Sequence, residues 1–460
     1  MNRRAFLSRT AVASAAVASG FAQDALTERP PNIVFILFDK CRRDAIGAYG
    51  LRDVHTPNID SLAETGVRFD ACYTPQALCG PARASMLTGS YPHMHGLRRN
   101  VYEAHPGASY STYQEVIPDP FRDSRFKLWD NFPHFLNVSG YATGHIGKWH
   151  LGPANPGFFD YWKGFNSVLL HWIGEPHNSR YRPDVHTDQG IRFIEDHKDE
   201  PFFLYQSYYS PHEPNDPPKR FLEQYEGQEH AEYYASVSAL DWNVGRILDS
   251  LRENDLLDNT LIIFGTEHGR SWIDRPGTQE GMCTAYEESA RIPFIMRYPK
   301  LLPQGKVWKS GVSLVDLMPT IMEVAGIRPV YSMMFRTLPQ IQGTSLIGKI
   351  QQDADVWDKP IVIENVPQRA IDGAIYDERA IRDRRYKLIL RKFEARPVIR
   401  PGELYDLDED PGETKNLYSS DPTQVKYLGG ELAKWGSEYD DPLATELGAW
   451  AWNGSHVSEG

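Results

Sequence analysis

Apolar residues along the first 355 positions fall into short continuous runs that alternate with longer amphipathic stretches. Residues 32–38 form an apolar run rich in β-branched side chains that ends at Asp39, as expected for a buried parallel strand with a polar residue at its carboxyl end. Further strands are expected at 202–205 and 260–264, and helices at 57–66, 188–197 and 230–251. This alternation predicts an α/β fold with a mostly parallel central sheet flanked by helices.

The pattern changes after residue 355. Short alternating strands are expected at 361–363, 379–382 and 386–390, with Pro and Gly turns between them and a helix over 423–435. Such a pattern favours a small antiparallel sheet and a helix, packed on the main domain. We therefore predict a main domain over 30–355 and a smaller C-terminal antiparallel-sheet subdomain over 356–450.

The N-terminus indicates an export signal. Residues 2–7 contain the twin arginines Arg3 and Arg4, and a soft apolar run over 10–20 follows. Small residues near Ala22 offer a cleavage site. Residues 1–22 are therefore predicted to be a twin-arginine signal peptide, and the mature protein is expected to be periplasmic or secreted.

Composition and charge narrow the class of partner. The 460 residues include 49 Lys and Arg against 61 Asp and Glu, a formal net charge of −12. This acidic balance argues against nucleic acid as the main partner, because phosphate binding favours a basic face. It is compatible with an anionic substrate held in a small cationic pocket. Four cysteines are too few for a disulfide scaffold, and the sequence offers no apolar run of about 18 residues to span a membrane.

Polar segments follow three of the predicted strands. They are Asp39, residues 207–214 and residues 266–269. Because ligands gather at the carboxyl ends of parallel strands, we expect the functional site to lie among these segments.

The most specific motif is Cys79-Gly80-Pro81-Ala82-Arg83. It resembles the maturation signature of the type I, formylglycine-dependent sulfatases of the alkaline phosphatase superfamily. Other segments resemble motifs of that family and follow in the same order: residues 147–152, 210–212, 286–293 and 403–407. The resemblance extends from Asn32 to Leu417 and is more specific than any one motif. It implies a sulfatase catalytic domain over 30–355.

The resemblance also implies roles for five residues. Cys79 would be oxidised by a maturation enzyme to formylglycine (3-oxoalanine), whose aldehyde hydrate is the nucleophile. One hydroxyl of a geminal diol can attack sulfur, and deprotonation of the other expels sulfate and regenerates the aldehyde. Arg83 and Lys148 would hold the hydrate. His150 would be the base for the elimination, and His212 would protonate the leaving alcohol, a task suited to a group that titrates near neutral pH.

The metal ligands implied by the resemblance are Asp39, Glu267 and His268, for an ion that in the family is usually calcium. Hard oxygen ligands suit that ion. Lys40 departs from the pattern, because the family has a second acidic or amide ligand at this position. Lys40 would either point into the site and take over part of the charge role of the ion, or turn outward and leave the gap to water.

A second departure concerns the binding of sulfate. Met282 stands where the family usually has a second sulfate-binding lysine. The substrate would then lose one cation, unless Lys40 or Arg270 replaces it.

Other polar and aromatic residues have two interpretations each. His93 and His95 follow the nucleophile segment and either contact substrate or serve the structure. The aromatic stretch around Trp162, Trp172 and His177 either stacks on sugar rings or fills the core. The remaining cysteines are expected to be structural: Cys41, Cys72 and Cys283.

The predicted function is hydrolysis of a sulfate ester on a carbohydrate, within a sulfated polysaccharide or its oligosaccharides, by an exported sulfatase. One alternative is a phosphodiesterase or phosphonate monoester hydrolase of the same superfamily, which the loss of a cation favours. The other is a degenerate sulfatase that binds sulfated glycans without turnover. Lys40 and Met282 motivate this third interpretation, and the intact motifs argue against it.

Overall fold

The computed structural model describes residues 29–50, 53–101, 131–273, 281–327, 341–365, 376–393 and 402–454. The chain divides into two compact units, Met1–Pro30 and Pro31–Gly460, and the following description concerns the second. The predicted signal peptide over 1–22 lies outside the described residues. Among the residues that are described, no helix is both long enough and apolar enough to cross a bilayer.

An eight-stranded sheet forms the centre of the main domain, with the order β12-β2-β11-β9-β1-β8-β4-β5. Five neighbouring strands are parallel to one another: β9 (Thr260–Thr266), β1 (Asn32–Phe38), β8 (Phe202–Tyr208), β4 (Ala142–Lys148) and β5 (Tyr161–Phe165). The other three strands are β11 (Phe294–Arg297), which is antiparallel to β9, β2 (Val67–Phe69) and β12 (Lys306–Trp308). The predicted fold class is therefore confirmed.

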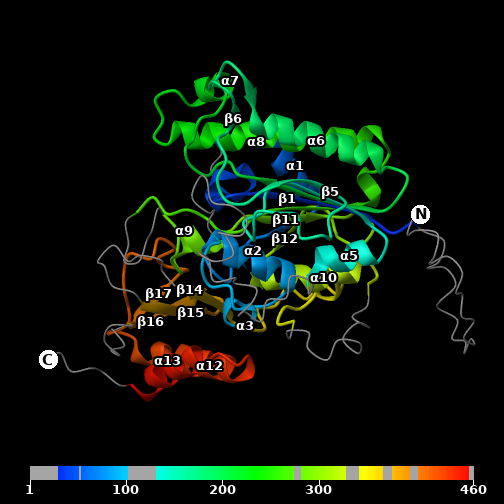
Figure 1. The fold of residues 1–460 in the computed structure, drawn as a ribbon. Coiled ribbons are helices and arrows are strands. Elements are labelled where there is room, and N and C mark those ends of the chain that lie inside the picture. Colours follow the sequence, from blue (N-terminus) through cyan, green and yellow to red (C-terminus); the bar gives the residue numbers. More distant parts are fainter. Residues whose placement is uncertain are drawn as a thin grey trace, which may run out of the picture. The chain divides into compact units, whose positions relative to one another are not determined.

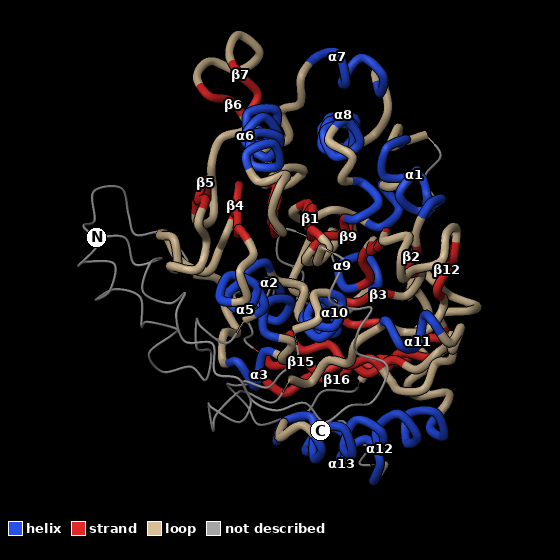
Figure 2. Tube along the Cα trace, turned by 90° about the vertical axis from the view of Figure 1, so that its right-hand side faces the viewer, coloured by secondary structure: helices blue, strands red, loops and turns tan. Residues whose placement is uncertain are grey.

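Helices cover both faces of this sheet (Figures 1 and 2). One layer contains α1 (Pro57–Thr65), α6 (Arg182–Asp196) and α8 (Ala231–Glu253), and the opposite layer contains α2 (Cys79–Thr88), α5 (Phe132–Val138) and α10 (Leu317–Val324). Successive side chains of a strand point to opposite faces, so β1 contributes to two hydrophobic cores. Ile33, Phe35 and Leu37 join the core with α2, whereas Val34, Ile36 and Phe38 join the core with α8.

The C-terminal subdomain is a four-stranded antiparallel sheet in the order β14-β15-β16-β17. The strands are β14 (Ile361–Asn365), β15 (Tyr376–Arg382), β16 (Tyr386–Phe393) and β17 (Glu403–Asp406). Two helices, α12 (Pro422–Glu438) and α13 (Pro442–Asn453), pack on each other and on this sheet. The sequence predicted this sheet and α12, but it missed β17 and α13.

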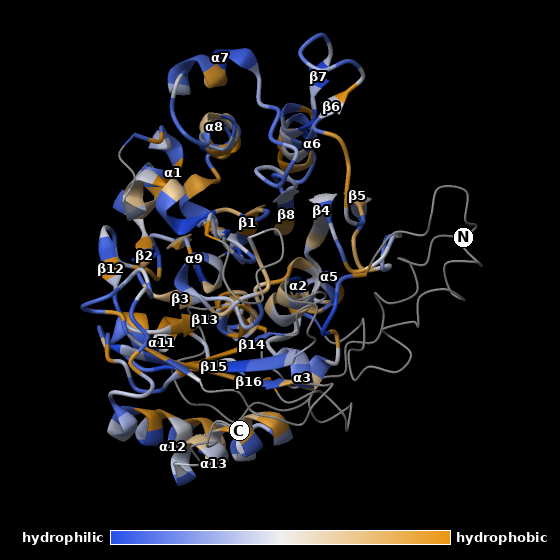
Figure 3. Cartoon of the chain, turned by 90° about the vertical axis from the view of Figure 1, so that its left-hand side faces the viewer, coloured by the Kyte–Doolittle hydropathy of each residue, from blue (hydrophilic) through white to orange (hydrophobic). Residues whose placement is uncertain are grey.

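Shorter elements connect these layers. The other strands are β3 (Cys72–Tyr73), β6 (Trp172–Ile173), β7 (Arg180–Tyr181), β10 (Arg291–Ile292) and β13 (Val312–Ser313). The other helices are α3 (Pro92–His95), α7 (Lys219–Leu222), α9 (Glu287–Ala290) and α11 (Ile347–Gln351), with 3-10 turns at Arg43–Ala45, Gly47–Tyr49, Glu223–Tyr225, Leu257–Asn259 and Leu314–Asp316. Figure 3 shows that α7 and the turn between β6 and β7 are mostly hydrophilic.

His93 ties α3 to the C-terminal subdomain. Its Nδ1 lies 2.5 Å from Glu364 Oε1, and its Nε2 lies 2.8 Å from the carbonyl oxygen of Tyr439. Both partners accept, so both ring nitrogens donate. Burial alone would lower the pKa of His93, but the Glu364 carboxylate raises it above the usual value. His95 is buried and bonds through Nε2 to Ser85 Oγ at 2.9 Å. The structural interpretation therefore holds for both histidines.

A substitution at Gly147 tests how closely β4 and β8 pack. It has φ +97°, and a Cβ placed there would lie 1.8 Å from the carbonyl oxygen of Ser207. We expect Gly147→Ala to lower the free energy of unfolding by about 3 kcal/mol, because the strands must separate locally. Urea unfolding measures this change.

Gly140→Ala is the matched control. Gly140 also has positive φ, +92°, but its Cβ would meet nothing within 4 Å. It should cost only about 1 kcal/mol, the usual penalty of an alanine in this region. Equal losses in both variants would contradict the role of the close contact.

Candidate active site

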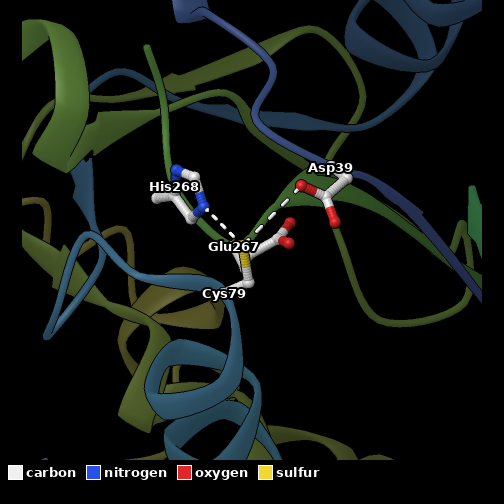
Figure 4. A group of neighbouring side chains, drawn as sticks. All are labelled: Asp39, Cys79, Glu267 and His268. Carbon is white, nitrogen blue, oxygen red and sulfur yellow. Dashed lines mark hydrogen bonds between the residues drawn. The ribbon is translucent and has the colours of Figure 1, made fainter. Parts of the chain in front are cut away.

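Four potential ligand groups meet at the carboxyl end of the sheet. Asp39 follows β1, Glu267 and His268 follow β9, and Cys79 is the first residue of α2. One ligand atom from each lies within 4.8 Å of the others. Figure 4 shows the sulfur of Cys79 directed between Asp39 and His268. Its Sγ lies 3.1 Å from His268 Nε2 and 3.9 Å from Asp39 Oδ1.

Two buried cations hold this group together. Arg83, one turn further along α2, lies 3.0 Å from Glu267 Oε1 and 3.2 Å from Asp39 Oδ2. Its other amino group donates to Ser207 Oγ at 2.8 Å and to the carbonyl oxygen of Lys148 at 2.6 Å. Lys148 Nζ, at the end of β4, lies 2.6 Å from Asp39 Oδ2. Each charge in this cluster therefore has an opposite charge beside it.

The two carboxyl groups differ in protonation. Burial raises the pKa of both, but Lys148 and Arg83 outweigh it at Asp39 and hold the pKa of that carboxyl well below its usual range. At Glu267 burial prevails and raises the pKa to about 8, with Asp39 adding to the effect. At neutral pH the pair therefore carries one negative charge and one proton.

Hydrogen bonds fix the tautomers of two histidines. His268 Nδ1 donates to the carbonyl oxygen of Gly269 at 2.8 Å, and His212 Nδ1 donates to that of Glu213 at 3.0 Å. The lone pair of each neutral ring is then on Nε2. Burial lowers the pKa of His268 to about 4 and that of His212 to about 2. The expectation that His212 titrates near neutral pH is therefore wrong here, because the ring is buried beside Lys148 and other cationic groups.

His150 is another of the predicted histidines. It is buried, and its backbone N–H donates to the carbonyl oxygen of Asn166 at 2.8 Å. Neither of its ring nitrogens has a hydrogen-bond partner among the described residues. Burial, with Lys148 and Arg83, holds the pKa of this ring well below the usual value. The imidazole is neutral and can accept a proton from a reactant. We call Cys79, Arg83, Lys148, His150, His212 and the ligand group the reaction centre.

Sequence reasoning missed two residues that position this centre. Ser207 accepts from Arg83 and donates to the carbonyl oxygen of Lys148 at 2.7 Å. The ring of Tyr209 stacks on His212 with centroids 4.7 Å apart, and Lys148 Nζ lies 5.0 Å from the Tyr209 ring centre. Both residues belong to the segment predicted at a strand end, but no motif distinguishes them within it.

Lys40 borders the reaction centre. It is fully buried, so the interpretation that it turns outward is wrong. Its Nζ lies 3.0 Å from Glu213 Oε2, and Arg270 forms an ion pair with the same carboxylate. The ion pairs to Asp39 come from Arg83 and Lys148. Glu213 is a third residue that the sequence did not single out.

Met282 and the aromatic stretch noted in the sequence make packing and hydrogen-bond contacts with neighbouring residues. Met282 is buried in an apolar cluster with Leu78, the residue before Cys79. Trp162 stacks on His145 at 4.8 Å, among the aromatic side chains beside β4. The indole of Trp172 donates to the carbonyl oxygen of Asp216 at 2.9 Å, and His177 pairs with the Asp216 carboxylate at 2.8 Å. The remaining cysteines are buried thiols, in accord with the prediction: Cys41, Cys72 and Cys283.

Comparison with known proteins places this site in a family. The Sulfatase family model matches residues 31–327, more than half of the chain, and the model N-sulphoglucosamine sulphohydrolase, C-terminal, matches residues 282–434. An N-acetylglucosamine-6-O-sulfatase of Bacteroides thetaiotaomicron is 25% identical over 84% of this chain and 82% of its own length. An ulvan-active sulfatase of Formosa agariphila is 27% identical over 92% of this chain and 83% of its own length.

Solved structures share the fold. One from Bacteroides fragilis has a TM-score of 0.75 at 24% identity, over 91% of this chain and 98% of that chain. Another, in complex with its substrate D-glucosamine-2-N,6-O-disulfate, has a TM-score of 0.71 at 24% identity, over 90% of this chain and 99% of that chain.

The family model and the relatives define an enzyme class, the hydrolases of sulfuric esters. The chain belongs to the sulfatase family, which confirms the resemblance seen in the sequence.

Ser207 tests how the reaction centre is positioned. Ser207→Ala leaves one buried donor of Arg83 without its acceptor, so we expect kcat/KM for an aryl sulfate to fall about tenfold. Steady-state kinetics measure the fall. Ser250→Ala is the matched control, because the Ser250 hydroxyl is buried and has no hydrogen-bond partner within the described part of the chain. A wild-type rate in Ser207→Ala would contradict the positioning role.

Proposed function

We propose that this sulfatase hydrolyses a sulfate ester on a carbohydrate, within a sulfated polysaccharide or oligosaccharide, and that residue 79 acts as formylglycine. The position of Cys79 carries the proposal: it is the first residue of α2, one turn before Arg83, and its sulfur faces His268. The positive end of a helix and nearby cations suit an anionic ester. Relatives named for N-acetylglucosamine-6-sulfate and ulvan support the carbohydrate class.

Each side chain then has a task in the reaction. If residue 79 carries the aldehyde, its hydrate would supply one hydroxyl to attack sulfur and a second whose deprotonation would expel sulfate. The ionised Asp39 carboxylate, which lies 3.9 Å from the residue 79 sulfur in the unmodified chain, would accept the proton of the attacking hydroxyl. Arg83 and Lys148 hold the hydrate and the ester oxygens, where the transition state gathers negative charge. The neutral ring of His150 accepts the proton of the second hydroxyl. The bound anionic ester raises the pKa of His212, whose Nε2 then takes up a proton from solvent and donates it to the leaving alcohol as the ester bond breaks.

The ligand group fits a divalent cation, and we propose calcium. Asp39 and Glu267 supply hard oxygen donors, and the tautomer of His268 leaves Nε2 available toward the same space. A bound cation supplies positive charge to the ester oxygens. Without a bound cation, a proton on Glu267 neutralises this carboxylate.

We also infer that the protein is exported by the twin-arginine route to the periplasm or beyond. The twin arginines Arg3 and Arg4, the apolar run over 10–20 and the small residues near Ala22 support this inference.

A substrate panel tests the function. It contains 4-nitrophenyl sulfate, sulfated oligosaccharides of defined structure, and phosphate and phosphonate esters. We expect the sulfated oligosaccharides to be hydrolysed fastest, and Cys79→Ala to lower the rate by several orders of magnitude because it removes the nucleophile. Faster hydrolysis of phosphodiesters would favour the superfamily alternative, and binding of sulfated glycans without turnover would favour a degenerate sulfatase.

The modification has its own measurement. Mass spectrometry of the peptide that contains residue 79 should show a loss of about 18 Da, the difference between a thiol and an aldehyde side chain. The protein must come from a host that has the maturation enzyme. An unmodified peptide in an active preparation would overturn the assignment of formylglycine.

Calcium affinity should depend on pH through Glu267. Because burial raises the pKa of Glu267 to about 8, this group holds a proton at neutral pH that a cation must displace. We expect affinity to rise between about pH 6 and pH 9, with up to about one proton released per ion. Calorimetry in buffers of different ionisation enthalpy measures both quantities.

Glu267→Gln removes this titration. It should bind calcium at least about tenfold more weakly and without the rise with pH. Glu253→Gln, an exposed substitution on α8, is the control and should behave like the wild type. A wild-type affinity that does not change with pH would contradict the role of Glu267.

A further inference from the structure

A cavity of about 780 Å³ opens beside the reaction centre. It is lined by residues of α7, the beginning of α8 and the segment after β9; α7 and α8 are labelled in the upper part of Figure 1. Its lining combines amide, cationic and aromatic side chains: Asn215, Lys219, His230, Tyr233, Arg270 and Trp272. The function proposed above does not use this cavity.

Two residues of the cavity wall contact neighbours of the reaction centre. Arg270 lines the cavity and pairs with Glu213, whose carboxylate also holds Lys40 and lies 3.4 Å from His212 Nδ1. Tyr233 lines the cavity too, and its hydroxyl donates to the carbonyl oxygen of Lys40 at 3.1 Å. Glu213, whose side chain is 34% exposed, therefore stands between His212 and the lining residue Arg270.

The chemistry of the lining suits a sugar. The rings of His230 and Trp272 stack with centroids 3.7 Å apart and planes at 9°, and the Arg270 guanidinium lies 4.2 Å from the Trp272 ring centre. Both faces of this indole are therefore covered, and the three side chains form one rigid part of the wall. Sugar hydroxyls bind to amide and charged side chains, and sugar C–H faces pack beside rigid aromatic groups. Asn215 and Lys219 offer such donors at the same cavity.

The charges do not suit a second sulfate. Glu213 already neutralises part of the charge of Lys40 and Arg270. The lining also includes Glu223, Glu226 and Glu232, against the single lysine Lys219. The Glu213 side chain is 34% exposed, so an incoming anion would meet its carboxylate directly. Such repulsion disfavours a sugar unit that carries a second sulfate without weakening the binding of an unsulfated unit.

We infer that this cavity binds the sugar unit next to the one that carries the scissile sulfate, and that Glu213 makes the cavity select a unit without a second sulfate. This inference rests on the proposed carbohydrate sulfatase function. The substrate class is then a sparsely sulfated glycan. Its sulfated unit binds at the reaction centre and the neighbouring unit binds in the cavity, with Glu213 between them.

Filling the cavity tests where the sugar binds. Ala231 lines the cavity at the start of α8, and Glu253 lies exposed at the other end of that helix. The measured quantity is kcat/KM for the best monosulfated oligosaccharide of the panel divided by kcat/KM for 4-nitrophenyl sulfate. We expect this ratio to fall at least about tenfold in Ala231→Trp and to keep its wild-type value in Glu253→Trp. An unchanged ratio in Ala231→Trp would overturn the assignment of the cavity.

Replacing the Glu213 carboxylate by an amide tests whether Glu213 selects against a second sulfate. The same oligosaccharide is compared with an analogue that carries a second sulfate on the neighbouring unit. In Glu213→Gln the preference for the monosulfated form should shrink about tenfold, because Lys40 and Arg270 can then bind the added sulfate. Glu253→Gln is the control and should keep the wild-type preference. A preference that persists in Glu213→Gln would overturn the role of Glu213.

These outcomes are distinct from a failure of the proposed function. An enzyme that hydrolyses 4-nitrophenyl sulfate but no oligosaccharide would contradict the carbohydrate function itself. An enzyme that hydrolyses oligosaccharides with ratios that no variant changes would contradict only the cavity.

Discussion

The buried charge cluster at the end of the parallel sheet is the interaction on which the rest of the site depends. Arg83 lies between Asp39 and Glu267, and Lys148 completes the neutralisation of Asp39. Unpaired, any of these charges would be costly to bury, so each one fixes the position of the others. All ten residues of α2 are buried as a result, and the helix that begins at Cys79 is held against the strand ends.

The same cluster sets the protonation of its neighbours. Positive charge and burial keep the imidazoles of His150 and His212 neutral. At Glu267 burial and the charge of Asp39 raise the pKa, against the opposing effect of Arg83 and Lys148. The cluster carries more positive than negative charge at neutral pH, inside a chain whose formal net charge is −12. An anionic ester is therefore attracted to one small region of an otherwise acidic protein, and its negative charge raises the pKa of the imidazoles beside it.

The sequence predicted the elements that carry a strong local signal. The strands β1, β8 and β9 contain continuous apolar runs because both of their faces are buried, and polar residues directly follow β1 and β9. The prediction for 188–197 began late because α6 starts at Arg182 with a polar first turn. The family motifs identified the charged residues of the site. Glu213 has no such motif: its partner Lys40 is 173 positions away, and only the pairing of β1 with β8 brings them together.

The burial of Cys79 determines when another enzyme can reach this residue. The folded chain leaves this side chain 1% exposed, at the start of a fully buried helix. An enzyme that oxidises residue 79 must therefore act while this part of the chain is still unfolded. Folding then buries residue 79 in the form that it has at that moment, thiol or aldehyde. Under the proposed formylglycine chemistry, the fraction of active molecules would be set once, by competition between modification and folding during synthesis, and later exposure to a maturation enzyme would not raise it.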